Sequence, residues 1–400
     1  MSNPKIRLRV IVILILFSAG RFISICSADE QVGTGIVLAD DQGKIVYGQN
    51  REKPFIPASI LKLLTSLAAI EILGQDYHFT TLYSFDQASK NLYIKGLGDP
   101  LFVSEVIETL CREIVLKTGP TQIHHILLDS TYFSGHIRIP GNGSSLNPYD
   151  ASVGALCANF NTLAFKWQSK EGRFISDEPQ TPLLPVFHDD IQKTGLKQGR
   201  IVLSQQQSLL YPGLLIKHGL EKHHISITGS VLQGTLDIQK QGVHTFVSPF
   251  DLKAVVQKLL KFSNNFMANQ LLLTIGAVTY GPPATLEKGI KAIQIFSEQQ
   301  LNLPLLTLSE GSGLSRKTLI SPDQMLKVLM GFMPFYAVLN NKGNDFFKTG
   351  TLTDVRTRAG YILGQDNRLY PYVIMMNGKT IDYTFIRKSL LNRVSQITTQ

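Results

Sequence analysis

Cysteine and charge are both scarce in this sequence. Three cysteines occur in 400 residues, and only 17% of the residues are charged, whereas 44% are hydrophobic. A disulfide-built scaffold and a disordered chain are therefore excluded, and the length allows a large core and about two domains. Once an N-terminal segment containing Cys26 is removed, Cys111 and Cys157 remain, as one disulfide bridge or as two buried thiols.

Motifs for metals, nucleotides and nucleic acids are also missing. The nine histidines include no H-E-x-x-H sequence or other obvious metal-ligand spacing, and the chain has no phosphate-binding lysine motif. The formal net charge of +9 comes from scattered lysines and arginines, without a long basic run or a helix-turn-helix signature. We therefore predict no metal, no cofactor and no nucleic-acid partner, and only an unspecific attraction to anionic envelope polymers and lipids.

The N-terminal segment has the features of a secretory signal peptide. Lys5, Arg7 and Arg9 precede an uncharged apolar stretch at 10–19, and small residues stand at positions −3 and −1 of a cleavage site after Ala28. No later segment is long and apolar enough to span a bilayer. We predict cleavage near Ala28 and a soluble, exported protein. The alternative is an uncleaved N-terminal anchor.

The order of the predicted elements divides the rest of the chain into three parts. Residues 29–76 contain two strands and an apolar helix, and residues 77–245 alternate short β-like pieces with turn clusters. Helical periodicity restarts at Val247, and residues 246–400 end with strands and a final helix. We expect an α+β fold in which a mostly β insertion, 77–245, interrupts one domain made of 29–76 and 246–400, after a signal peptide at 1–28.

A serine and a lysine lie one helical turn apart in the segment Pro57-Ala58-Ser59-Ile60-Leu61-Lys62. We expect Ser59 at a helix N-terminus, where free N–H groups and the helix dipole favour negative charge. Lys62 lies on the same face of a helix that is otherwise apolar, so burial should lower its pKa and make the neutral amine available as a general base. The alternative is that Ser59 only caps the helix while Lys62 forms an ion pair or reaches solvent.

A second motif, S-x-N, occurs three times, and its context distinguishes the copies. Ser89 and Ser145 lie in polar, turn-like stretches. Ser263-Asn264-Asn265 directly follows a predicted helix and precedes an apolar run. A connection between two helices can direct Ser263 and Asn265 into a cleft, although a simple polar connection has the same appearance.

A third motif, K-T-G, also occurs three times. The copies at Lys117 and Lys193 lie at a predicted helix end and after a charged loop, whereas Lys348-Thr349-Gly350-Thr351 lies in the C-terminal β region. An edge-strand lysine with flanking hydroxyls suits a terminal carboxylate. Gly350 would leave room for a substrate backbone to lie alongside the strand.

The three motifs in this order resemble those of the penicillin-binding, serine-acylating superfamily. More closely, the chain resembles the peptidase S13 family, the D-alanyl-D-alanine carboxypeptidase/endopeptidases of the class C low-molecular-mass penicillin-binding proteins. Asn264 and Glu310 stand where aspartate is common in that family. Beyond the three motifs, the resemblance rests on further segments: Gly98-Asp99-Pro100, Asn147-Pro148-Tyr149, Asn159-Phe160-Asn161, Glu310-Gly311-Ser312-Gly313-Leu314-Ser315-Arg316 and Ala359-Gly360-Tyr361.

The resemblance implies a fold and an acylation chemistry. The fold would be a serine β-lactamase/transpeptidase-like α/β sandwich, an antiparallel sheet flanked by helices, with the insertion between the first two motifs. Ser59 would attack the penultimate D-alanine carbonyl of a peptidoglycan stem peptide, and Lys62 would take its proton. Ser263, together with Lys348, would relay a proton to the departing amine, and Asn265 would orient the substrate amide and Lys62.

The resemblance also implies a substrate clamp, ligands and a location. Lys348, Thr349 and Thr351 would bind the terminal carboxylate alongside Gly350, and the backbone N–H groups of Ser59 and Thr351 would hold the oxyanion. Water would then hydrolyse the acyl-enzyme. The expected partners are peptidoglycan stem peptides, with β-lactams as covalent inhibitors, in the periplasm or cell envelope and with peripheral contact to membrane or cell wall.

Two alternative functions remain open from the sequence. A β-lactamase would use the same nucleophile but deacylate quickly, and no glutamate-containing deacylation motif is evident. A non-catalytic cell-wall-binding protein would keep the cleft without turnover, and the intact set of Ser59, Lys62, Ser263 and Lys348 argues against it. The sequence does not choose between carboxypeptidase and cross-link endopeptidase activity.

Overall fold

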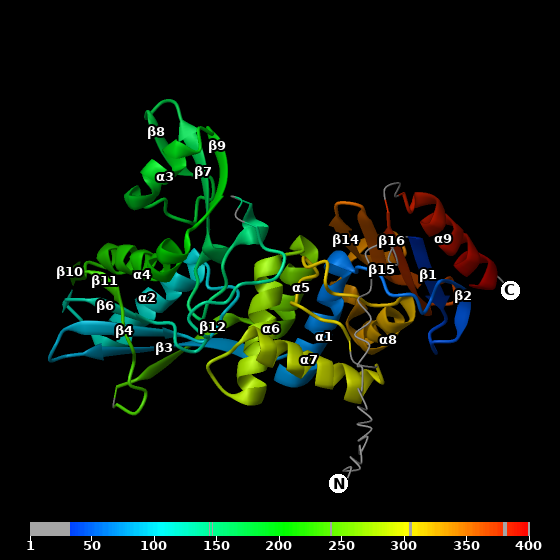
Figure 1. Cartoon of the computed structure of the whole chain (residues 1–400). Helices are drawn as coiled ribbons and strands as arrows, with labels where there is room; N and C mark the ends of the chain where they lie inside the picture. The colour runs from blue at the N-terminus through cyan, green and yellow to red at the C-terminus, as the bar shows by residue number, and fades with distance from the viewer. Residues whose placement is uncertain are drawn as a thin grey trace, which may run out of the picture.

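The computed structural model describes residues 33–398 apart from 144, 146, 241, 304–305 and 379–381. The predicted signal peptide, residues 1–28, lies outside the described residues. A six-stranded sheet and an inserted lobe lie at opposite ends of the molecule, with a layer of helices between them (Figure 1). Within the part of the chain that the structure describes, no helix is both long and apolar enough to cross a membrane.

The six-stranded sheet is built from the first and the last strands of the chain. β1 pairs with β16, so that Val37 lies opposite Val373. All neighbouring strands are antiparallel. The strand order is β13 (Asn340–Lys342), β14 (Asp345–Leu352), β15 (Val355–Leu363), β16 (Leu369–Asn377), β1 (Gly33–Ala39) and β2 (Ile45–Gln49).

Helices cover both faces of this sheet, because its inner strands are apolar on both sides. Val373 of β16 belongs to the main core, whereas Ile374, its neighbour in sequence, packs against α9 (Thr384–Thr398). An antiparallel sheet between helical layers is the fold class that the sequence predicted. The helices of the main core are α1 (Lys62–Leu73), α5 (Leu252–Phe262), α6 (Asn265–Tyr280), α7 (Leu286–Leu301) and α8 (Pro322–Phe332).

The inserted lobe has its own hydrophobic core and its own sheets. A three-stranded sheet of β8 (Arg173–Ser176), β7 (Thr162–Gln168) and β9 (Gln198–Val202) projects from it, with α3 (His188–Lys193) beside it (Figure 1). β5 (Gln122–Ile123) and β10 (Ser226–Ile227) form a short parallel pair. The main sheet of the lobe has the order β11 (Val231–Gln233), β6 (Ile126–Asp129), β4 (Asn91–Gly96), β3 (His78–Asp86) and β12 (His244–Asp251).

The segment that we expected to be mostly β also contains two long helices, α2 (Ser104–Thr118) and α4 (Gln205–Lys222). The apolar residues of α2, including the free thiol of Cys111, recur at helical spacing and face the core of the lobe. α4 was harder to foresee because Pro212 and Gly213 interrupt it. Gly213 is needed there, since a Cβ atom at this position would lie 2.5 Å from Val231.

Strand β12 crosses the boundary that we placed after residue 245. It pairs with β3 of the inserted lobe, and α5 begins only at Leu252. The predicted restart of helical periodicity at Val247 was therefore wrong for residues 247–251. The side chain of Asp251 accepts a hydrogen bond from the backbone N–H of Ala254 and thereby caps α5 at a later position.

Candidate active site

The chain around Ser59 forms a short 3-10 turn, Ala58–Leu61, that leads directly into α1. Ser59 therefore lies at the start of a helical segment, one residue after the point where the turn begins. Ala58 is fully buried and has a φ of 47°, a left-handed conformation that is uncommon for a residue with a side chain. The backbone is held there by Thr357 of β15, whose hydroxyl donates to the carbonyl oxygen of Pro57 at 2.7 Å.

Lys62 is the first residue of α1 and is fully buried. Its Nζ atom lies 3.0 Å from Ser59 Oγ, 2.7 Å from Asn265 Oδ1 and 2.7 Å from the carbonyl oxygen of Ser312. The pKa of Lys62 is lowered to about 7, mainly by burial and also by the nearby charge of Lys348, whereas Glu310 acts in the opposite direction. Near neutral pH a large fraction of Lys62 is thus an uncharged amine next to a serine hydroxyl.

Ser263 lies at the corner between α5 and α6. It ends α5 with a left-handed φ of 54°, and the Asn264 side chain then caps α6 by accepting from the backbone N–H of Met267. This sharp corner places Ser263 and Asn265 on the same cleft. Asn265 accepts the bond from Lys62, so the corner is tied directly to α1.

Lys348 lies on β14 and approaches the same corner from the sheet. Its Nζ atom donates to Ser263 Oγ and to the carbonyl oxygen of Thr349, both at 2.8 Å. Burial lowers the pKa of Lys348 to about 8. The site therefore contains two serine–lysine pairs, Ser59 with Lys62 and Ser263 with Lys348, and Lys62 also contacts Asn265 on the same corner as Ser263.

The edge of β14 forms one wall of the site. β13 pairs with β14 only at residues 345–347, so Lys348 and the residues after it lie beyond the described pairing on that edge. A Cβ atom added at Gly350 would lie 2.7 Å from the backbone nitrogen of Ser59, so glycine allows this strand to run directly beside Ser59. Thr351 follows at the surface of the cleft, whereas Thr349 is half-buried.

A buried carboxylate, Glu310, organises the loop that contacts Lys62. It accepts hydrogen bonds from the backbone N–H groups of Ser312 and Gly313 at 2.7 and 2.6 Å, and from the Ser312 hydroxyl at 2.6 Å. Asn269 of α6 also donates to it. The same loop presents the Ser312 carbonyl to Lys62. We assigned no role to Glu310 from the sequence, although an acidic residue within a run of glycine and serine was a usable signal.

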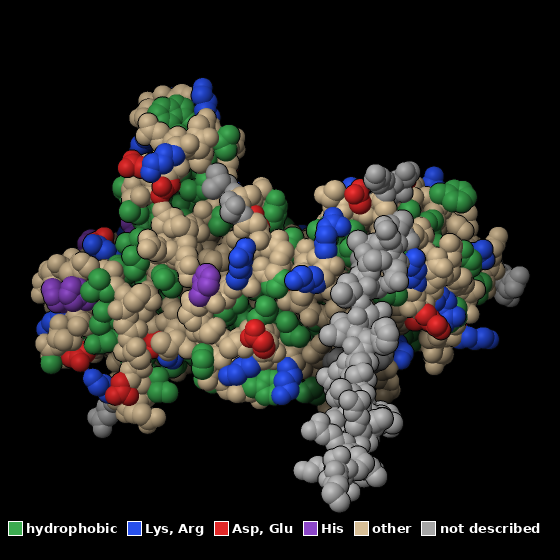
Figure 2. Space-filling view, viewed as in Figure 1, with side chains coloured by type: hydrophobic (Ala, Val, Ile, Leu, Met, Phe, Trp, Pro, Cys, Tyr) green, Lys and Arg blue, Asp and Glu red, His purple; other side chains and the backbone are tan. Residues whose placement is uncertain are grey.

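The serines and Asn265 open onto a cleft of about 1060 Å³ between the sheet and the inserted lobe. The space-filling view shows this face hollowed between the projecting β7–β9 sheet and the six-stranded sheet (Figure 2). The structure thus brings together seven of the eight residues predicted for the site, with Lys62 and Lys348 buried behind the surface. The eighth, Thr349, is half-buried, and it is not among the described residues that line the cleft. The cleft residues from the inserted lobe, which the sequence reasoning did not select, include Tyr149, Phe160, Glu178 and Arg200.

An antiparallel sheet between helical layers, with these motifs at the junction of sheet and helices, defines the penicillin-binding, transpeptidase-like class of proteins. The solved structure of penicillin-binding protein 4 (dacB) from Haemophilus influenzae has this fold, with a TM-score of 0.72 and 20% identity over 91% of this chain and 96% of that chain. The same protein has also been solved in complex with a β-lactam.

The sequence comparisons identify the family. The model of the D-Ala-D-Ala carboxypeptidase 3 (S13) family matches residues 26–333, and the chain belongs to this family. It is 24% identical to a D-alanyl-D-alanine carboxypeptidase of Actinomadura sp. (strain R39), over 86% of this chain and 78% of that protein. It is 26% identical to the D-alanyl-D-alanine carboxypeptidase DacB of Haemophilus influenzae, over 84% of both chains.

Proposed function

We propose that this protein is a serine-type D-Ala-D-Ala carboxypeptidase that removes the terminal D-alanine from peptidoglycan stem peptides through an acyl-enzyme on Ser59. The observation that carries the proposal is the 3.0 Å contact between Ser59 Oγ and the Nζ of a fully buried Lys62. Membership of the S13 family and the names of its relatives support the substrate class.

In the first step, neutral Lys62 accepts the proton of the Ser59 hydroxyl while Oγ attacks the carbonyl carbon of the penultimate D-alanine. A carbonyl oxygen held by the backbone N–H groups of Ser59 and Thr351 takes up the negative charge. The free edge of β14 next to Ser59 supports this assignment, because it leaves Thr351 beside the nucleophile.

In the second step, the C–N bond breaks and the departing D-alanine amine needs a proton. Ser263 is suited to deliver it, since its hydroxyl is hydrogen-bonded to the Lys348 ammonium group. Lys348 also supplies the positive charge for the terminal carboxylate, together with the hydroxyls of Thr349 and Thr351. Water then hydrolyses the ester on Ser59 and regenerates the enzyme.

We further propose that β-lactams acylate Ser59 and are released slowly, and that the same cleft accepts the D-alanyl bond of a cross-link. The protein would act in the periplasm or cell envelope after removal of residues 1–28, with peripheral contact to the membrane or wall. The division into a domain of 29–76 with 246–400 and an insertion of 77–245 remains part of this proposal, although strand β12 continues the sheet of the inserted lobe to Asp251.

The test combines product analysis with mass spectrometry. Purified protein is incubated with a synthetic stem peptide ending in D-Ala-D-Ala, with a cross-linked muropeptide dimer, and separately with penicillin. We expect D-alanine release from the peptide and a long-lived penicillin adduct on Ser59, both lost in Ser59→Ala and kept in Ser89→Ala. Rapid penicillin turnover without D-alanine release would favour a β-lactamase, and no adduct would favour a wall-binding protein.

A further inference from the structure

Three consecutive residues beside the active-site cleft adopt a left-handed backbone conformation. Asn159, Phe160 and Asn161 have φ values of 48°, 59° and 53°. Left-handed residues with side chains are uncommon and cost free energy, and they persist only where their surroundings hold them. Contacts within the inserted lobe must therefore hold this turn in its conformation.

The two asparagine side chains hold the turn from both ends. The Asn159 carboxamide accepts from the backbone N–H of Ser104 at 2.9 Å and donates to the Tyr211 hydroxyl at 3.0 Å. The Asn161 Nδ2 atom donates to the carbonyl oxygen of Ser152 at 2.8 Å, and its buried Oδ1 atom has no partner among the described residues.

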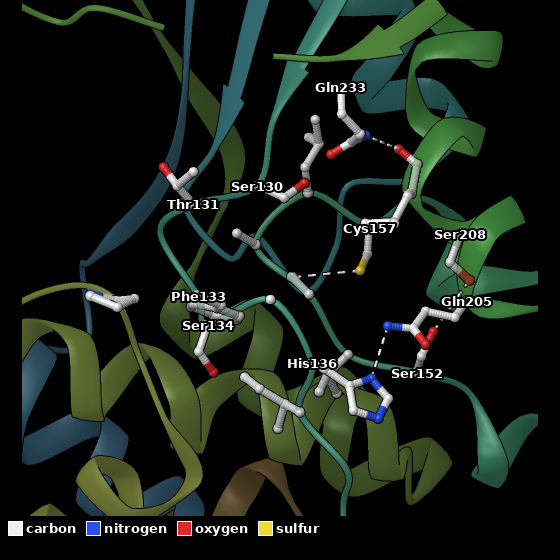
Figure 3. A pocket seen from close by; sticks show the side chains of 18 of the residues that line it. Ser130, Thr131, Phe133, Ser134, His136, Ser152, Cys157, Gln205, Ser208 and Gln233 are labelled. Carbon is white, nitrogen blue, oxygen red and sulfur yellow. Dashed lines mark hydrogen bonds between the residues drawn. The ribbon is translucent and has the colours of Figure 1, made fainter. Parts of the chain in front are cut away.

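The turn lies between two cavities. Phe160 lines the active-site cleft, where its ring meets Phe266 edge to face. Asn161 lines a second cavity of about 800 Å³. The other wall residues of this cavity come from 130–137, from 152–157, from the start of α4 and from the end of β11 (Figure 3).

The second cavity differs from the cleft in its charge. The cleft is lined by Glu105, Glu178, Arg200 and Lys258. The described residues that line the second cavity include no aspartate, glutamate, lysine or arginine. Its polar groups are hydroxyls, carboxamides, one imidazole and the thiol of Cys157, whose pKa is raised to about 12 by burial, so that it stays neutral.

The size of the cavity and its uncharged lining, in which polar groups stand among apolar side chains, restrict the occupant. A cavity of about 300–1,000 Å³ is typical of small-molecule sites. A charged ligand would lose hydration here without gaining a charged partner, which is costly, whereas an uncharged ligand rich in hydroxyl and amide groups would find donors and acceptors on several walls. Figure 3 shows Ser130 and Thr131 on one side, and Gln205 and Ser208 on the other.

We propose that this second cavity binds an uncharged, N-acetylated saccharide, the chemistry of the glycan backbone of peptidoglycan. The choice of a glycan rests on the proposed function. A stem peptide carries carboxylate and ammonium groups that suit the charged cleft, whereas the sugars to which it is attached carry hydroxyl and acetamido groups. One loop, residues 148–162, separates the two cavities, so a glycan in one lies close to a peptide in the other.

The test measures the binding of N,N′,N″-triacetylchitotriose, which carries no peptide, by saturation-transfer NMR. We expect binding to the wild type and to Ser59→Ala alike, with maltotriose, which lacks acetamido groups, bound at least tenfold more weakly. The variant Gln205→Trp should weaken binding at least tenfold by filling the cavity mouth. Its matched control is Gln206→Trp, an exposed neighbour on the same helix that does not line the cavity.

Circular dichroism and thermal unfolding establish that the tryptophan variants are folded, and Gln233→Leu, at the end of β11, serves as a second probe. No binding at millimolar saccharide would overturn the proposal. So would binding that Gln205→Trp and Gln233→Leu leave unchanged, or binding that a β-lactam displaces from the wild type. Penicillin acylation of Ser59 tests the catalytic proposal independently, because the saccharide assay does not require the nucleophile.

Discussion

The two serine–lysine pairs of the site are built by different parts of the molecule. Ser59 and Lys62 are three residues apart on one helical segment, whereas Ser263 and Lys348 come from a corner between helices and from a sheet strand. Lys62 is the more deeply shielded, and its pKa falls to about 7, against about 8 for Lys348. This difference supports the proposal that Lys62 of the local pair is the base and that Lys348 of the long-range pair is a cation.

The largest effect is expected from Lys62→Met, which removes the base and keeps the length of the side chain. Acylation by penicillin should fall by about 10³-fold, within the range for general-base catalysis. The free energy of unfolding should fall by about 1–3 kcal/mol, because the buried carbonyl oxygen of Ser312 loses its donor. Lys117→Met, in an exposed copy of the K-T-G motif, is the control, and stopped-flow acylation with thermal unfolding is the measurement. A loss below tenfold would contradict the role of Lys62.

Ser263→Ala should have the next largest effect. We expect about a 10²-fold lower kcat/KM for a peptide ending in D-Ala-D-Ala, because the departing amine loses its proton donor. The rise of the rate with pH near 7, which reflects the deprotonation of Lys62, should stay at the same pH. Ser89→Ala, in an exposed S-x-N copy, is the matched control. Equal kinetics for the two variants would remove Ser263 from the mechanism.

The pH dependence separates the two pairs. The acylation rate should rise as the pH passes about 7, where Lys62 loses its proton, and fall above about 8, where Lys348 loses its charge. Lys348→Met should abolish the alkaline limb. It should also move the acidic limb to higher pH, because the charge of Lys348 lowers the pKa of Lys62. Acylation rates of the wild type and Lys348→Met, measured between pH 5.5 and 9.5, test both effects. If neither limb of the pH profile changes in Lys348→Met, the two pairs are not coupled.

Glu310→Gln should change the pKa of Lys62, and its effect on the acylation rate should be smaller than those of the preceding variants. Loss of the negative charge should move the acidic limb to lower pH, since Glu310 raises the pKa of Lys62. The amide group accepts fewer of the loop hydrogen bonds, so the protein should also lose about 1–3 kcal/mol of stability. Glu298→Gln, on the exposed surface of α7, is the control. A loss of stability with an unmoved limb would leave Glu310 as a structural residue only.

The smallest effect is expected from Asn264→Asp, which introduces the residue that is common in the family. Aspartate also caps a helix, and its charge at the N-terminus of α6 should add about 0.3–1 kcal/mol of stability. Asn264 directly follows Ser263, which Lys348 contacts, so the new negative charge should move mainly the alkaline limb, to higher pH. Differential scanning calorimetry and the same pH series measure both, and a shift of the acidic limb instead would reverse the assignment of the two pairs.

The sequence predicted the contact of Ser59 with Lys62 well, because one helical turn fixes it. S-x-N and K-T-G each occur three times, so Ser263 and Lys348 were chosen by the predicted secondary structure around each copy. The sequence alone could not show their contact, because tertiary packing brings them together. The contact of the Ser312 carbonyl with Lys62 could not be assigned from sequence, because a loop conformation sets its position. Glu310 carried a usable signal, an acidic residue within a run of glycine and serine, but its hydrogen bonds depend on the same loop conformation. The left-handed turn at 159–161 was equally hidden, since the side chain of Asn159 holds it through Ser104 and Tyr211, which are distant in the sequence.

The pairing of β1 with β16 has a consequence for how the protein is made. Val37 meets its partner Val373 only when nearly the whole chain exists, and β14, which carries Lys348, belongs to the same late sheet. Such long-range pairing makes folding slow and dependent on the C-terminus. A chain still being synthesised therefore carries the nucleophile without the strand that completes its surroundings. Any activity directed at the cell wall can begin only after the last strand has been released.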